Sequence, residues 1–334
     1  LSFKHTDWDY SNDGYAPSLN GYYRKPALNQ DFYTLMPALL LAMFATLLLR
    51  SSYGPLPALI AADLGIGVPL VAQMLTVETG LTIIAALIIA PLSDRLGRRR
   101  TALSGTLLRV SGAILVALAP NFAVLVAGAA LLGLGYGALM PQLFGSLADS
   151  YPGAARDRRI TALIMASRVA MVLAPLLSGF LAAQFQWRLA YIAGAAVTIF
   201  SLLAIYRLIP ESRPPEDTRH VSLFDLFFTA VFRVLRTRVA VLALLGNLFY
   251  GIGAYGIESF LGPFIAGAYE LDTGRVGMFL AIGPGVSIAG LALGGRTGLN
   301  LRLPILIGTS LVFAVAQTLL LTLQVAPWFM ALTY

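Results

Sequence analysis

The sequence contains no cysteine and only two histidines among its 334 residues. The absence of cysteine excludes disulfides and thiolate metal sites. Both histidines, His5 and His220, lie outside the apolar stretches, which disfavours zinc sites and Ser-His-Asp catalysis. We therefore expect no enzyme, no cofactor and no bound metal.

Charged residues are also scarce, at 12% of the chain, whereas soluble domains carry about 25%. Apolar residues make up 58%, and the mean hydropathy is +0.78. A net charge of +7 raises the question of nucleic acid, but basic residues also mark the cytoplasmic loops of membrane proteins. The composition favours a protein embedded in a lipid bilayer that binds no nucleic acid.

Ten apolar stretches have the length of membrane spans, since a helix needs ~20 apolar residues to cross the hydrocarbon core. They are Tyr33–Ala62, Val68–Ala90, Thr101–Ala119, Phe122–Leu147, Ile160–Phe185, Arg188–Ile209, Val239–Ala266, Val276–Leu293, Leu303–Leu323 and a tenth beginning near Pro327. Prolines in these spans predict helix breaks, at Pro55, Pro57, Pro141, Pro175, Pro263 and Pro284.

The basic residues also predict the orientation. With the N-terminus in the cytoplasm, 18 of the 23 Lys and Arg residues fall in inner segments, and only Arg188 and Arg275 fall in outer turns. Three more, Arg50, Arg109 and Arg168, lie inside spans. Because cytoplasmic loops carry the excess of basic residues, the N-terminus is predicted to be cytoplasmic.

A weak internal repeat suggests two halves. Tyr53-Gly54 recurs as Tyr255-Gly256, and "DRLGRRR" after the second span has a worn counterpart, "GRTGLNLR", after the eighth. Two six-helix halves are a common plan for transporters. The predicted parts are an aromatic-rich polar arm (residues 1–32), a six-helix bundle (33–209), a cytoplasmic linker (210–238) and a second bundle holding helices 7–9 and the start of helix 10 (239–334).

Two segments outside the spans allow alternative interpretations. The aromatic arm either binds a protein partner or packs on the inner face of the protein itself. The linker stretch "VSLFDLFFTAVFRVLR" is either an amphipathic helix at the inner membrane surface or the cytoplasmic start of the seventh span.

"PLSDRLGRRR", between the second and third spans, resembles the loop signature of the major facilitator superfamily. "YGPLPALIAADLG" resembles the end of the first helix in its drug and sugar efflux branches, and "FQWRLAYIAGA" and "LIPES" resemble the ends of its sixth helix. The resemblance implies an all-α membrane fold of two six-helix bundles, the second incomplete in this chain, with a substrate site between them. Unlike proton-coupled members, this chain has no arginine in "LLGLGYGALMPQLFG" of the fourth span.

The same resemblance implies a charge network at the cytoplasmic gate. Its residues are Asp94, Arg95, Gly97, Arg98 and Asp149, with Gly97 supplying the tight turn. An ion pair at the inner rim that forms in one state and breaks in the other would bias a two-state equilibrium. The alternative is that the basic loop only anchors the topology.

Ionisable residues inside spans are costly and therefore mark candidate functional sites. Arg50 and Glu78 lie at similar depth on neighbouring antiparallel spans, which predicts a buried pair, either a substrate or proton site or a structural ion pair. Glu258 of the seventh span is a candidate coupling carboxylate, and Gln142 is a candidate cavity contact. Arg109 and Arg168 are expected to extend to the inner headgroups.

Together these features predict a secondary carrier in a bacterial inner membrane that exports a small organic molecule in exchange for protons. Arg50 favours an anionic or amphipathic molecule. The alternative is a transport-inactive subunit or assembly factor of a larger membrane complex, held through the aromatic arm.

Overall fold

The computed structural model describes residues 32–151, 153–209 and 260–297, together with residues 236, 237, 241 and 258. Every labelled element in this part of the chain is an α-helix. The aromatic arm, nearly all of the linker, most of the seventh span, and the ninth and tenth spans lie outside the described residues, as does Tyr255-Gly256 of the repeat.

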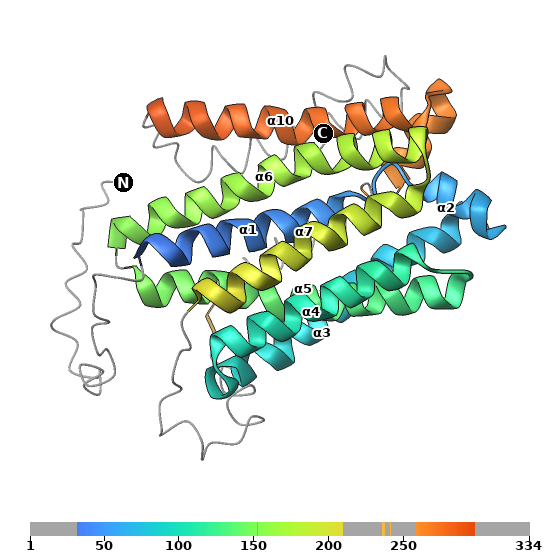
Figure 1. The fold of residues 1–334 in the computed structure, drawn as a ribbon. Coiled ribbons are helices and arrows are strands. Elements are labelled where there is room, and N and C mark those ends of the chain that lie inside the picture. The colour runs from blue at the N-terminus through green and yellow to red at the C-terminus, as the bar shows by residue number, and fades with distance from the viewer. Residues whose placement is uncertain are drawn as a thin grey trace, which may run out of the picture.

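The described helices lie side by side along one common direction (Figure 1). Their bounds follow the predicted spans closely: α1 Phe32–Ser51, α2 Pro57–Leu64, α3 Val68–Leu96, α4 Arg98–Ala117, α5 Phe122–Ser150, α6 Gly153–Gln184, α7 Trp187–Leu208 and α10 Thr273–Thr297. A further helical stretch covers Phe260–Tyr269, at the end of the seventh predicted span. Four helices have the length and apolarity to cross a membrane within the described residues: α3, α5, α6 and α7.

The first predicted span is divided into α1 and α2. Ser52 Oγ donates to the Leu48 carbonyl at 2.7 Å, and the chain turns before α2 begins with Pro57 in its first turn, where proline is well tolerated. The predicted breaks at Pro141, Pro175, Pro263 and Pro284 were wrong, because these prolines lie inside α5, α6, the helix Phe260–Tyr269 and α10. Loss of a single backbone hydrogen bond does not end a helix that its neighbours support.

The N-terminal helices share two apolar clusters. One lies toward the outer end and includes Leu49, Met74 and Tyr191. The other lies toward the cytoplasmic end and includes Leu39, Leu143 and Leu163. On α4, Arg109 falls between Ala102 of the second cluster and Ala113 of the first.

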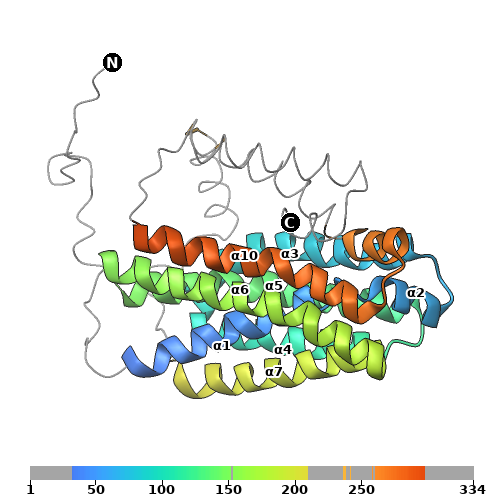
Figure 2. The same cartoon turned by 90° about the horizontal axis from the view of Figure 1, so that it is seen from above.

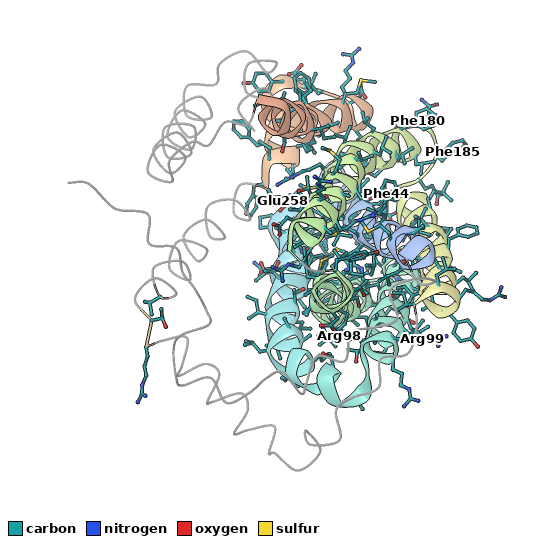
Figure 3. All side chains as sticks on the ribbon, turned by 90° about the vertical axis from the view of Figure 1, so that its left-hand side faces the viewer. Phe44, Arg98, Arg99, Phe180, Phe185 and Glu258 are labelled. Carbon is teal, nitrogen blue, oxygen red and sulfur yellow. The ribbon has the colours of Figure 1, made fainter. Side chains whose placement is uncertain are left out.

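The C-terminal helix α10 packs along α6, as both ribbon views show (Figures 1 and 2). A Cβ atom added to Gly277 of α10 would collide with the Pro175 carbonyl oxygen of α6, so the backbones approach closely near the outer ends of the two helices. The outward surface is apolar: Phe180 and Phe185 project away from the bundle (Figure 3) and are 57% and 65% exposed. Acyl chains rather than water solvate such a surface.

Candidate functional site

Four helices bring one buried ionic cluster together, formed by Arg50 of α1, Glu78 of α3, Arg109 of α4 and Tyr136 of α5. Glu78 lies 10 residues from the start of α3 at Val68, about 15 Å at 1.5 Å per residue. The cluster is therefore near the middle of the hydrocarbon core, which is ~30 Å thick.

The predicted pair of Arg50 and Glu78 is confirmed. Arg50 Nη1 lies 3.5 Å from Glu78 Oε1, and the two side chains are only 7% and 3% exposed. Their role at a substrate or proton site remains a prediction.

Arg109 does not extend to the headgroups, so that expectation was wrong. Its side chain is fully buried; Nη1 donates to the Leu132 carbonyl at 3.1 Å, and Nη2 donates to the Thr46 carbonyl at 2.9 Å. Nη1 also lies 4.0 Å from Glu78 Oε1. These partners sit on α1, α3 and α5, which draw the guanidinium into the bundle instead of toward water.

Tyr136 lies against both guanidinium groups. Its ring centroid is 5.5 Å from Cζ of Arg50 and 5.3 Å from Cζ of Arg109, within the range of cation–π attraction. The sequence analysis noted the stretch around Tyr136 only for its lack of an arginine. A lone tyrosine among glycines in an apolar span was the available signal.

Close packing of α3 on α5 positions Glu78. A Cβ atom added to Gly133 of α5 would collide with the backbone of Glu78, so only glycine permits this approach. One turn further along α3, Thr82 Oγ1 donates to the Gly133 carbonyl at 3.1 Å and to the Glu78 carbonyl at 2.8 Å. The backbone that carries Glu78 is thereby fixed opposite Arg50.

Glu258 of the seventh predicted span interacts with this cluster from the second half of the chain. Its carboxyl interacts electrostatically with Arg50 and Glu78, and with Tyr53 in the turn after α1. Figure 3 shows Glu258 where the C-terminal helices meet the N-terminal bundle. The candidate coupling carboxylate is thus linked electrostatically to the predicted pair.

Gln142 of α5 is 1% exposed, and within the described part of the chain neither atom of its amide has a hydrogen-bond partner. Arg168 is half-buried on α6, with Nη1 3.7 Å from the Met171 sulfur. Among the described residues, neither Gln142 nor Arg168 makes a hydrogen bond or an ion pair with the ionic cluster.

The predicted cytoplasmic network is present in part. Gly97 joins α3 to α4 with φ +92°, a backbone conformation that favours glycine. Arg98 Nε lies 2.6 Å from Asp149 Oδ2 at the end of α5. The side chains of Asp94 and Arg95 lie outside the described part of the structure.

A second charged cluster, not expected from the sequence, lies at the outer end. Asp63 Oδ2 of α2 accepts from Trp187 Nε1 at 3.2 Å and from Arg188 Nη1 at 2.5 Å, both at the start of α7. Arg188 Nη2 also donates to the Ala119 carbonyl after α4 at 3.0 Å. These bonds tie α2 to the ends of α4 and α7.

The sequence profile of the Major Facilitator Superfamily matches residues 39–334. This chain belongs to the major facilitator superfamily. The family consists of membrane transporters, and the described helices have the all-α fold of that superfamily.

Individual relatives agree with this family. The multidrug efflux pump LfrA of Mycolicibacterium smegmatis is 33% identical over 43% of this chain and 29% of its own length. The multidrug resistance protein MdtL of Escherichia fergusonii is 28% identical over 48% of this chain and 42% of its own length. The chain thus spans less than half the length of either relative.

Solved structures show the same fold at low sequence identity. A bacterial homologue of the human lysosomal transporter Spinster, solved in an inward-facing and unoccupied conformation, has a TM-score of 0.66 and 18% identity. That match covers 90% of this chain and 71% of the other.

Proposed function

We propose that this protein is a secondary carrier that exports a small organic anion or amphipathic molecule in exchange for protons, by alternating access. The buried cluster of Arg50, Glu78, Arg109 and Tyr136 carries the proposal. Each charged side chain at such a depth costs ~2.5–3.5 kcal/mol on insertion scales, and such groups typically mark substrate and ion pathways.

The charges of the cluster favour an anion. Its N-terminal helices contribute two guanidinium groups but one carboxylate, and both guanidinium groups lie against the neutral ring of Tyr136. Arg50 is the less enclosed of the two arginines, so it is the proposed contact for the substrate. The names of the relatives, a multidrug efflux pump and a multidrug resistance protein, support export as the direction.

Glu258 is the proposed proton-carrying group. It comes from the second half of the chain and interacts electrostatically with Arg50. A proton on Glu258 would leave more positive potential at Arg50, so proton and anion occupancy would depend on one another. Gln142 is proposed as a further polar contact along the substrate path.

Alternating access would use contacts at both ends of the helices. At the outer end, Gly277 packs against Pro175 across the two halves. At the cytoplasmic end, Arg98 pairs with Asp149. We propose that the cytoplasmic pair breaks and re-forms as the two halves rock, because a carrier alternates between states that close opposite ends.

The test is flux in liposomes that contain the purified protein alone, with radiolabelled benzoate as the anionic probe and ethidium as the cationic probe, with and without a pH gradient. Gradient-driven benzoate movement that Arg50→Ala abolishes and Arg50→Lys partly retains would support the proposal. Arg168→Ala is the matched control, since Arg168 lies on α6 away from the cluster's recorded contacts. Benzoate flux that survives Arg50→Ala intact would overturn the substrate assignment.

The alternative, a transport-inactive subunit held by residues 1–32, depends on residues outside the described part of the chain. The same liposomes distinguish it, because a subunit that needs partners would move neither probe. A bacterial inner membrane is the proposed location, in keeping with the bacterial relatives.

A further inference from the structure

Glu78 has two possible counter-ions at nearly equal distance. Its Oε1 atom lies 3.5 Å from Arg50 Nη1 and 4.0 Å from Arg109 Nη1. Within the described part of the chain this buried oxygen makes no hydrogen bond. A charge-assisted hydrogen bond is ~2.7–2.9 Å long, so Glu78 is in full contact with neither arginine. A movement of its carboxylate by about 1 Å would complete a bond with either one.

The two arginines are held differently. Arg109 is anchored by the carbonyls of Leu132 and Thr46 and is fully buried. Arg50 is in the last turn of α1, beside the turn that leads to α2. Arg109 is therefore a fixed internal charge, whereas Arg50, at 7% exposed, is the less enclosed of the two arginines.

We infer that Glu78 exchanges between these two counter-ions. In the empty carrier it shares its charge with Arg50; when an organic anion binds Arg50, the carboxylate turns to Arg109. Arg109 is thus a positioning residue, because it keeps the buried carboxylate paired while Arg50 is occupied. The inference rests on the proposed function for the identity of the anion at Arg50.

The other titratable groups near Glu78 are consistent with this role. Tyr136 of α5 and Tyr191 of α7 are neutral phenols, and Tyr191 interacts electrostatically with Glu78. Glu258 carries the same sign of charge as Glu78 and also interacts with it, so it cannot replace either arginine. Among the described residues, Arg50 and Arg109 are the cations within 4.0 Å of Glu78.

Infrared spectroscopy of the purified protein at neutral pH tests the exchange without any ligand. The signal is the carbonyl band of a protonated carboxylic acid, assigned to Glu78 by its disappearance when Glu78→Gln is added to the variant that shows it. An opposite charge nearby favours the ionised carboxylate, so we expect no Glu78 band in Arg50→Gln or in Arg109→Gln. We expect the band to appear when both substitutions are combined.

A Glu78 band in either single variant would overturn the inference, because one arginine would then be insufficient as a counter-ion. Failure of the double variant to show the band would also overturn it. If Arg109→Gln does not fold, as judged by size-exclusion chromatography and helicity, Arg50→Gln alone still decides. In the Arg50→Gln background, Arg109→Lys should show no Glu78 band, since lysine keeps a positive charge at that position.

A binding measurement links the exchange to the substrate. In Arg109→Gln, benzoate on Arg50 would leave Glu78 as an unpaired buried charge, so benzoate affinity should fall by roughly a hundredfold. Combining Glu78→Gln with Arg109→Gln should remove that loss, because no carboxylate then needs a partner. If Arg109→Gln lowers benzoate affinity equally with and without Glu78→Gln, the result would contradict the exchange. If the unsubstituted protein binds no benzoate, the proposed anion specificity fails, and the infrared result still decides the inference.

Discussion

Thr82 of α3 donates a hydrogen bond to the carbonyl of Gly133 on α5 at 3.1 Å. This bond joins the two helices beside Glu78, where the absence of a side chain at Gly133 lets the backbones approach. Helix interfaces in membranes depend on such small residues and interhelical hydrogen bonds, since lipid supplies no hydrophobic driving force between helices.

Substitution of Gly133 tests this close approach. Gly133→Ala should destabilise the protein by about 1–3 kcal/mol and reduce transport, because the added methyl group pushes Glu78 away from Arg50. The measurements are the apparent melting temperature in detergent and liposome flux. Gly80→Ala on α3 is the matched control: Gly80 is exposed and an added Cβ atom contacts nothing within 4 Å. Equal effects of the two substitutions would contradict the packing argument.

The cytoplasmic pair of Arg98 and Asp149 should matter for transport rate more than for stability. The two side chains are 25% and 55% exposed, and exposed pairs contribute about 0.2–1 kcal/mol. We expect Arg98→Asp and Asp149→Arg to slow flux each by about tenfold, which corresponds to ~1.4 kcal/mol, and their combination to recover most of the rate.

The control for that experiment is the exposed pair of Arg275 and Asp272 at the outer start of α10, with atoms 3.1 Å apart. Reversing its charges should leave the flux nearly unchanged. If the doubly substituted Arg98 and Asp149 variant stays as slow as the single variants, the pair is only a topology anchor.

The outer cluster around Asp63 should contribute to stability. Asp63→Asn weakens the bonds from both Trp187 and Arg188, so we expect a loss of about 1 kcal/mol, at the lower end of values for charged hydrogen bonds because Asp63 is 41% exposed. Trp187→Phe keeps an aromatic ring but removes one donor, and should cost less. The apparent melting temperature measures both, and an unchanged value in Asp63→Asn would show that the cluster does not hold α2.

Substitution of Gln142 by leucine should raise stability and lower transport. An unpaired buried amide costs about 1–3 kcal/mol, so Gln142→Leu should raise the apparent melting temperature. If Gln142 contacts the substrate, as proposed, the same substitution should lower benzoate flux severalfold. A more stable protein with unchanged flux would remove Gln142 from the substrate path.

Several features could be predicted from the sequence because they are encoded locally. The apolar spans gave helix bounds close to those observed, and Gly97 marked the turn between α3 and α4. The pairing of Arg50 with Glu78 followed from their equal depth, although α1 packs mainly on α6 and α7 rather than on α3. The helix bounds, the turn and the ion pair each depend on position along the chain, and hydropathy and charge can be read at each position of the sequence.

The tertiary structure alone decided which way each side chain faces. In lipid, a helix is apolar on all sides, so the periodicity that reveals the buried face of a soluble helix is weak. Position along α4 therefore could not distinguish an Arg109 that reaches the headgroups from one enclosed by α1, α3 and α5. The rotation of each helix about its own axis determines that Arg109 faces the bundle interior. It also places Tyr136 against both guanidinium groups.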